Sequence, residues 1–162
     1  YIPARELPDE EYPLMLTTGR ILYHYTTRAM TGRTPELMEI EGNSFIEINT
    51  EDAKKLGVEN GERVKVLSRR GEITSEARVS DKTNPGETWM PFHFPDGDCN
   101  WLTNAALDKY ARIPEYKVCA CRVEKIPESE AYTADGTYIS QKLVAQLKEA
   151  ELKAEAAGII ED

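Results

Sequence analysis

The sequence NTEDAKKLGVENGERVKV, residues 49–66, predicts a short helix followed by a tight turn and a strand. Asn49 or Thr50 can cap a helix over residues 51–56, with acids in its first turn and lysines near its end. Such a cap satisfies free backbone N–H groups, and the charges match the helix dipole. Gly57 then supplies the residue at which helices commonly stop. This unit sets the scale of the fold, which consists of short elements separated by turns.

Short strands flank this unit on both sides. The pair Asn60-Gly61 favours the positive φ angles of a tight turn, and residues 63–66 alternate as a half-buried strand does. The other predicted strands cover residues 14–16, 45–48, 73–79, 88–94 and 118–123. Many short strands with regular turn signals predict a mainly β fold, either a barrel or a sandwich.

The two ends of the chain differ from this middle part. Residues 1–12 are rich in proline and glutamate without a hydrophobic period, so we interpret them as a linker entering a domain over residues 13–126. In the C-terminal extension, residues 127–162, four apolar side chains fall at helical spacing. They are Ile139, Leu143, Val144 and Leu147. We expect an amphipathic helix over about 139–157, docked on the barrel, the parent protein or a neighbouring subunit.

The composition excludes several classes of protein. The length of 162 residues suits one domain, and a start at Tyr1 rather than Met leads us to expect a piece of a longer protein. A net charge of −9 disfavours binding to nucleic acid, and no apolar run is long enough to span a membrane. Three cysteines do not make a secreted disulfide framework, so we expect the cytoplasm. A leader in a missing N-terminal part would leave the periplasm open.

The cysteines do not have the spacing of a metal site. Cys119 and Cys121 share one face of a predicted strand, and no Cys or His partner lies at zinc spacing. We interpret them as buried core thiols and Cys99 as a loop thiol. We therefore expect no metal ligand among the cysteines of this chain.

A series of motifs in a fixed order resembles one known family. It runs from TGR at residues 18–20, through the unit at residues 49–66, to SRRG at 68–71 and MPFHF at 90–94. Over roughly residues 12–124 it resembles the molybdopterin-dinucleotide-binding domain of the dimethyl-sulfoxide-reductase superfamily, most of all that of formate dehydrogenase catalytic subunits. The resemblance implies a six-stranded double-psi β-barrel, with the C-terminal helix as an extension.

The same resemblance implies a cofactor, partners and an activity. The cofactor is bis-molybdopterin guanine dinucleotide with molybdenum or tungsten, shared between this domain and the rest of the catalytic subunit. In the family, the metal ligand and the His and Arg of the redox chemistry come from other domains. We therefore expect the isolated chain to be inactive in formate oxidation, and we expect iron–sulfur electron-transfer subunits as further partners.

The resemblance also assigns a set of cofactor-binding residues. They are Thr18, Gly19, Arg20, His24, Thr26, Thr31, Phe92, His93, Asn100, Thr103, Tyr116 and Lys117. An Arg fork and an imidazole can bind pterin edges or phosphate oxygens, although a surface Arg20 and a packed His24 are the plainer interpretation. Many family members have His where Thr26 stands, so we expect the contact there to be lost, changed or bridged by water. Because strands alternate, His93 and its two Phe neighbours cannot share a face.

We expect Arg20, His24, Asn100 and Lys117 to converge on one surface. An amide suits the paired edge of a pterin, and a lysine can meet a phosphate, although loop-stabilising and solvated roles are equally ordinary. Without ligand, we expect residues 20–33 to be mobile.

Two other functions stay open. The chain can be the same domain of a nitrate reductase or a formylmethanofuran dehydrogenase. It can also be a non-catalytic double-psi module, as found in ATPase complexes, although such modules lack the motif series. The C-terminal helix and PEYK at residues 114–117 favour formate dehydrogenase.

Overall fold

The computed structural model describes residues 2–126, 131–132 and 138–139. The chain forms two units, Tyr1–Lys125 and Ile126–Asp162. The first unit contains β1 (Leu14–Gly19), α1 (Pro35–Ile40), β2 (Phe45–Ile48), α2 (Thr50–Leu56), β3 (Arg63–Ser68), β4 (Gly71–Val79), β5 (Glu87–Pro91) and β6 (Cys119–Lys125). In the second unit, β7 (Ala131–Tyr132) and β8 (Tyr138–Ile139) form an antiparallel pair. The helix predicted over 139–157 lies outside the described residues, apart from Ile139, which belongs to β8.

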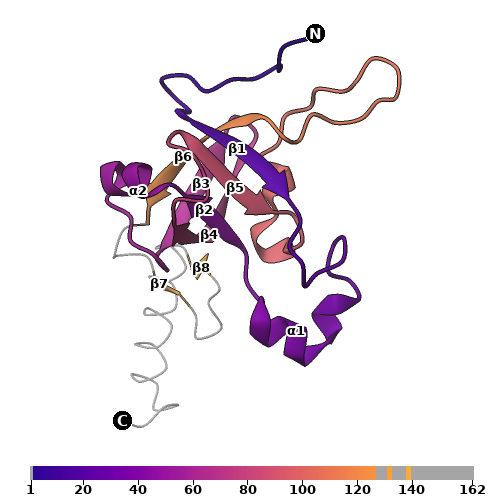
Figure 1. Cartoon of the computed structure of the whole chain (residues 1–162), viewed down its shortest axis with the longest axis vertical. Helices are drawn as coiled ribbons and strands as arrows, with labels where there is room; N and C mark the ends of the chain where they lie inside the picture. Colours follow the sequence, from indigo (N-terminus) through magenta and orange to yellow (C-terminus); the bar gives the residue numbers. More distant parts are fainter. Residues whose placement is uncertain (1, 127–130, 133–137, 140–162) are drawn as a thin grey trace, which may run out of the picture. The chain divides into compact units, whose positions relative to one another are not determined.

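The strands of the first unit close into a six-stranded barrel in the order β1-β5-β2-β4-β3-β6 (Figure 1). β1 runs parallel to β5, and β2 runs parallel to β4, while the other neighbours are antiparallel. Closure pairs both edges of the sheet, so the barrel presents no open edge strand. The structure therefore confirms a mainly β barrel and excludes the sandwich. Within the described part of the chain, no helix is of the length and apolarity that crossing a membrane requires.

Alternate side chains of the strands fill the barrel. Val64 and Val66 on β3 are fully buried, as are Cys119 and Cys121 on β6, which confirms the interpretation of these two cysteines as core thiols. Cys99, expected in a loop, is also fully buried in this core because the short 3-10 helix η3 (Cys99–Trp101) folds inward. Burial raises the pKa of Cys99 and of Cys121 to about 12, so both stay neutral thiols.

Helix α2 begins and ends as the sequence predicts. The side chain of Asn49 accepts a hydrogen bond from the backbone N–H of Glu51 at 2.9 Å. Gly57 ends the helix with a φ of 67°, and Gly61 turns the chain with a φ of 86°. The signals that define this unit all lie within a few residues of it, which is why sequence alone locates it.

The chain after β5 departs from the prediction. The strand was expected to reach Phe94, but it ends at Pro91, and the next residues bend inward. His93 and Phe94 are both only 1% exposed, so the alternation expected to separate them does not apply beyond Pro91. Helix α1 and the 3-10 turn η1 (Thr31–Arg33) were not predicted either.

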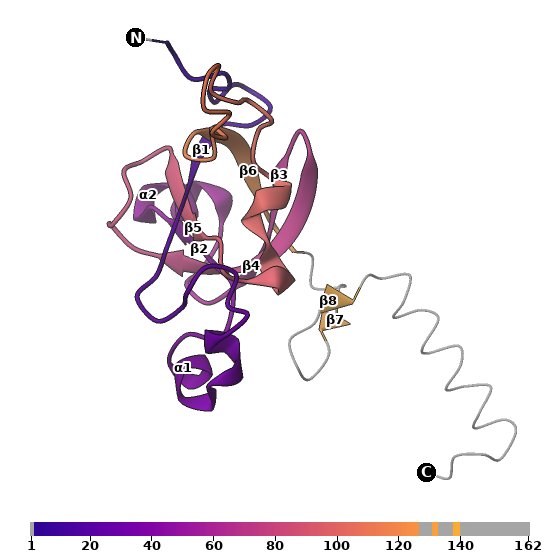
Figure 2. The same ribbon diagram turned by 90° about the vertical axis from the view of Figure 1, so that its right-hand side faces the viewer.

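Residues 2–12, expected to be a linker, lie on the barrel. Figure 2 shows this segment beside the long connection that leads into β6. The backbone N–H of Arg5 donates to Glu115 at 3.1 Å, and the Glu6 carboxylate binds Arg69 and Arg70. Tyr12 is 8% exposed and lies under the Arg69 guanidinium. The segment is therefore part of the first unit.

Candidate functional site

One end of the barrel gathers the residues that the sequence singled out. Because β1 and β5 are parallel, their carboxyl ends at Gly19 and Pro91 meet there. β6 runs antiparallel to β1, so residues 116–118, just before β6, reach the same end. The chain over residues 92–118 starts and finishes at this end. We call this end of the barrel, where Gly19, Pro91 and residues 116–118 lie, the β1–β5 rim.

The start of β6 is bonded to the end of β1. The Thr18 hydroxyl donates to the carbonyl of Tyr116 at 2.8 Å, and the Thr17 hydroxyl donates to the carbonyl of Lys117 at 2.9 Å. The Lys117 ammonium donates in return to the carbonyl of Thr18. Thr18 and the backbone of Tyr116 are thus used within the fold. Lys117 is exposed, and its ammonium has donors left for a ligand.

Arg20 is the most available cation of the rim. Its guanidinium lies 5.7 Å from the centre of the Phe92 ring and is exposed. It donates no hydrogen bond to another described residue, so its planar fork stays available to an anion. Gly19, just before it, serves packing, because a Cβ there would come within 2.5 Å of the Trp89 indole nitrogen.

His93 is a buried support of the neighbouring segment. Its Nε2 accepts from the backbone N–H of Ile21 at 3.0 Å, and its Nδ1 donates to the carbonyl of Thr26. These two bonds require the neutral ring. Burial lowers the pKa of His93 below its ordinary value; the bond to Thr26 opposes this shift, and the nearby His24 and Arg20 add to it. The His93 imidazole therefore binds both ends of residues 21–26. The sequence predicted instead that this ring presents a polar edge to a ligand.

His24 is also occupied by the fold. It is 5% exposed, and its Nδ1 lies 3.0 Å from the hydroxyl of Thr31, while its Nε2 contacts the carbonyl of Glu41. The ring stands edge-on to Phe94 at 5.5 Å between centroids. The Thr31 hydroxyl also accepts from the backbone N–H of Tyr25 at 3.3 Å. The plainer interpretation of a packed histidine matches this geometry.

The segment between β1 and α1 is fixed at several points. Thr26 and Arg28 have φ angles of 43° and 62°, a backbone region that residues other than Gly seldom adopt. Arg28 donates to the carbonyl of Gly42 at 2.6 Å and lies 4.8 Å from the centre of the Phe94 ring. With the bonds of His24 and His93, these contacts hold the segment at several points. Its mobility without ligand stays a prediction that hydrogen exchange would test.

Asn100 and Thr103 lie in the connection that crosses the rim. The side chain of Asn100 is exposed, and its backbone and side-chain N–H groups both donate to Asp98, at 2.9 and 2.8 Å. The Thr103 hydroxyl donates to the carbonyl of Asn100 at 3.1 Å. Asn104, which the sequence reasoning missed, fixes the connection by donating to the carbonyl of Val118 at 2.9 Å. No local pattern marks that role, because a single Asn in a loop is common.

Of the four residues expected to converge, Arg20 and Lys117 both lie at the carboxyl end of β1, where the Lys117 ammonium binds Thr18. Asn100 lies in η3, which contacts β4, and His24 is turned inward. The convergence of Asn100 with the two cations stays a prediction. The exposed polar groups named so far carry several donors: the guanidinium of Arg20, the ammonium of Lys117 and the amide of Asn100. Thr103 is partly buried, and its hydroxyl donates to Asn100. Such a set fits a ligand rich in phosphate oxygens and hydrogen-bonding ring edges. The described residues contain no group of three or more His, Cys, Asp or Glu that could hold a metal ion.

A hollow of about 450 Å³ lies beside this rim, between residues 21–23 and the outer faces of Phe45 and Trp89. Its charged walls are already paired, since Arg78 binds Glu41, and Lys82 binds Glu47 at 3.1 Å. The hollow therefore adds aromatic surface next to the rim but little spare charge.

Relatives of this chain are large proteins of which it matches a small part. It is 53% identical over 126 residues to the F420-dependent formate dehydrogenase subunit alpha of Methanocaldococcus jannaschii, covering 78% of this chain and 19% of that protein. It is 47% identical over 124 residues to the nitrate reductase of Symbiobacterium thermophilum, covering 74% of this chain and 16% of that protein. The chain thus spans about a fifth of the length of the formate dehydrogenase alpha subunits to which it is similar.

The fold also occurs in a solved structure of low sequence similarity. Acetylene hydratase from Pelobacter acetylenicus superimposes with a TM-score of 0.66 at 16% identity, covering 77% of this chain and 21% of that chain, which shows the fold alone. Residues 14–120 match the family model described as the molydopterin dinucleotide binding domain. The match runs from the start of β1 into β6 and includes the whole rim, so the chain belongs to the molydopterin dinucleotide binding domain family.

Proposed function

We propose that this chain is the cofactor-binding part of a formate dehydrogenase catalytic subunit, and that its β1–β5 rim holds bis-molybdopterin guanine dinucleotide. The observation that carries this proposal is the exposed Arg20 guanidinium, which is braced on Phe92 and makes no hydrogen bond to a described residue. Family membership supports the cofactor, and the 53% identity to a formate dehydrogenase subunit alpha supports the substrate. Either molybdenum or tungsten fits this proposal.

The rim residues divide into two groups by what they bind. Arg20 and Lys117 would hold phosphate oxygens, and Asn100 and Thr103 would hold ring or ribose edges. The other members of the predicted set would position the segment after β1 and the start of β6, and so Arg20 and Lys117: Thr18, Gly19, His24, Thr26, Thr31, Phe92, His93 and Tyr116. The bound cofactor supplies the redox chemistry of formate oxidation. This chain's own residues orient it and exclude water from one side.

The finer description of the barrel belongs to the same proposal. We assign it to the double-psi type, because its two parallel pairs, β1 with β5 and β2 with β4, join strands that are not consecutive in sequence. Each parallel pair requires a connection that crosses the barrel end, as interlocked barrels have.

The partners and the compartment complete the proposal. The rim would face the remaining domains of the same subunit, and iron–sulfur proteins would carry the electrons onward. Three free thiols suit a reducing cytoplasm.

Titration of the chain with GDP, a fragment of the dinucleotide, tests the rim. We expect backbone amide shifts to gather on residues 19–31, 92–103 and 117. Shifts that spread evenly over the barrel, or no shifts at millimolar GDP, would show that the rim of the isolated chain does not bind GDP specifically. The whole catalytic subunit that contains this chain should then be assayed for formate oxidation and for nitrate reduction. Nitrate is the second candidate substrate because the chain is 47% identical to a nitrate reductase.

A further inference from the structure

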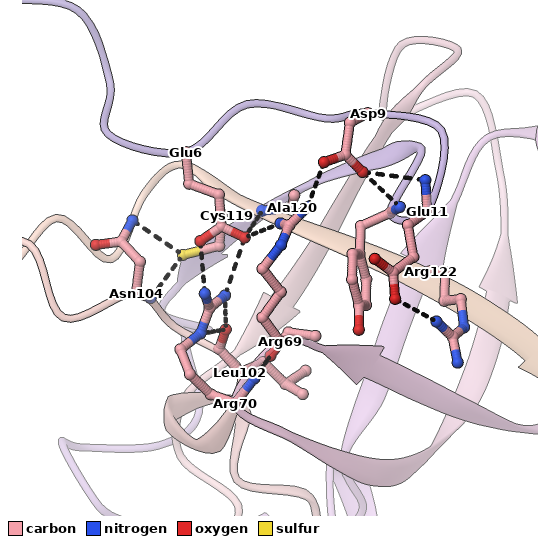
Figure 3. A network of polar contacts seen from close by, with 12 residues as sticks. Glu6, Asp9, Glu11, Arg69, Arg70, Leu102, Asn104, Cys119, Ala120 and Arg122 are labelled. Carbon is pink, nitrogen blue, oxygen red and sulfur yellow. Dashed lines mark hydrogen bonds and ion pairs between the residues drawn. The ribbon is translucent and has the colours of Figure 1, made fainter.

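A carboxylate near the start of the chain binds two consecutive arginines at the β3–β4 turn. The Glu6 side chain, 11% exposed, accepts from Arg69 at 2.9 Å and from Arg70 at 2.6 and 3.2 Å. It also accepts from the backbone N–H of Ala120 on β6 at 3.3 Å. Figure 3 shows Glu6 between the turn and β6. One side chain therefore joins the entering segment to two strands.

The two arginines have different second partners. Arg70 donates from Nε and Nη2 to the carbonyl of Leu102, at 3.0 and 2.6 Å. Arg69 instead binds Asp9 (Figure 3). Its guanidinium also covers the ring of Tyr12. Arg70 thus binds the connection that crosses the rim, residues 98–104. The partners of Arg69, in contrast, are residues of the entering segment.

Leu102 lies in the middle of the rim connection. It is fully buried, and it follows the 3-10 helix η3, which bears Asn100, and precedes Thr103. On its far side, Asn104 binds the start of β6 through Val118 and through the Cys119 sulfur at 3.3 Å. The connection is thus fixed at two points, one on β6 and the other on Arg70.

We propose that Glu6 and Arg70 form a positioning pair that couples the entering segment, residues 2–12, to the rim connection, residues 98–104. A guanidinium can satisfy a carboxylate and a carbonyl at once, because its donors diverge in a fixed plane. Glu6 orients the guanidinium of Arg70, and that guanidinium fixes the position of the Leu102 carbonyl. The chain that enters from the rest of the subunit therefore influences how Asn100 and Thr103 are presented. Their role as ligand groups rests on the proposed function.

Hydrogen exchange of the chain tests the coupling without any cofactor. The reporters are the amides of Trp101 and Leu102, which donate to the carbonyls of Asp98 and Cys99 at 3.1 and 3.0 Å. In Arg70→Gln, we expect their protection to fall about tenfold, since a carbonyl loses two charge-assisted bonds. Glu6→Ala should lower it in the same direction, although Glu6 does not touch the connection. The matched control is Arg69→Gln, which also loses a bond to Glu6 but none to Leu102.

Each result decides the coupling. Equal protection at Trp101 and Leu102 in Arg70→Gln and in the Arg69→Gln control overturns it, as does an unchanged value in Glu6→Ala. A uniform loss of protection over the whole barrel in Arg70→Gln also overturns the coupling, because that pattern indicates global destabilisation.

GDP titration then separates this inference from the proposed function. If the wild-type chain fails to bind GDP while exchange at residues 98–104 responds to Glu6→Ala, the coupling stands and the cofactor assignment of the isolated rim fails.

Discussion

At the residue scale, His93 links the stability of the barrel to pH. Its folded pKa is lowered below the ordinary value of 6.5, chiefly by burial, so the unfolded chain binds the proton first as pH falls. The free energy of unfolding should therefore be highest above pH 6.5 and should fall below it. In His93→Gln this dependence should flatten, and the loss of well-formed bonds should cost about 1–3 kcal/mol at pH 7.5.

Urea unfolding at pH 7.5 and pH 5.5 measures both effects. The chain has only two histidines, and His24 remains in the variant, so the difference between the two pH profiles isolates His93. An equally steep profile in the variant would assign the pH dependence to another group.

Arg20 should matter for ligand binding and hardly at all for folding. Arg20→Lys keeps the charge but loses the planar fork and much of the contact with Phe92, so GDP affinity should fall about tenfold. Unfolding in urea should change by less than about 0.5 kcal/mol, since Arg20 is exposed. Arg33→Lys is the control, because Arg33 is also exposed and lies in the same segment. Equal loss of GDP binding in both variants would remove Arg20 from the site.

At the scale of elements, α2 depends on a residue with two duties. Asn49 caps the helix and also donates from its side chain to the carbonyl of Thr83 at 2.7 Å, which ties α2 to the turn before β5. Asn49→Ala should lower the free energy of unfolding by about 2 kcal/mol, and Asn49→Asp by less, since it keeps the cap and loses the donor. Urea titration of both variants measures this order. Equal losses in the two variants would show that the bond to Thr83 dominates, because both variants lose it.

The elements that sequence predicts are those whose causes are local. The cap at Asn49 and the stop at Gly57 lie within the helix they define, so α2 is found correctly. The end of β5 at Pro91 depends instead on His93, whose partners lie 72 and 67 residues away in sequence. The candidate site divides in the same way. Its motifs at residues 18–20 and 90–94 lie at one end of the barrel, but only the fold shows that His24 and His93 face inward.

At the scale of the whole first unit, the entering segment is bound by charge over a large sequence separation. Glu6 meets Arg70 across 64 residues, and no spacing rule connects them. Composition alone therefore describes residues 1–12 as a linker, whereas in the described part of this segment Glu6 and Asp9 bind the arginines of the β3–β4 turn. This arrangement gives the barrel a dependence on its own N-terminal segment that an ordinary linker would not create.

Truncation measures that dependence. A chain that begins at Glu11 keeps Tyr12 and the strands but loses Glu6 and Asp9, which leaves Arg69 and Arg70 without their carboxylates. Its free energy of unfolding should fall, so it should unfold at a lower urea concentration than the full chain, and the shift should be modest because both arginines are partly exposed. A chain that begins at Pro3 keeps both carboxylates and should unfold at the same urea concentration as the full chain. If the two truncated chains unfold together, the segment adds no stability, and its contacts with the turn follow the barrel rather than support it. High salt provides a second check, because it should narrow the gap between the two truncations if the lost interactions are ion pairs near the surface.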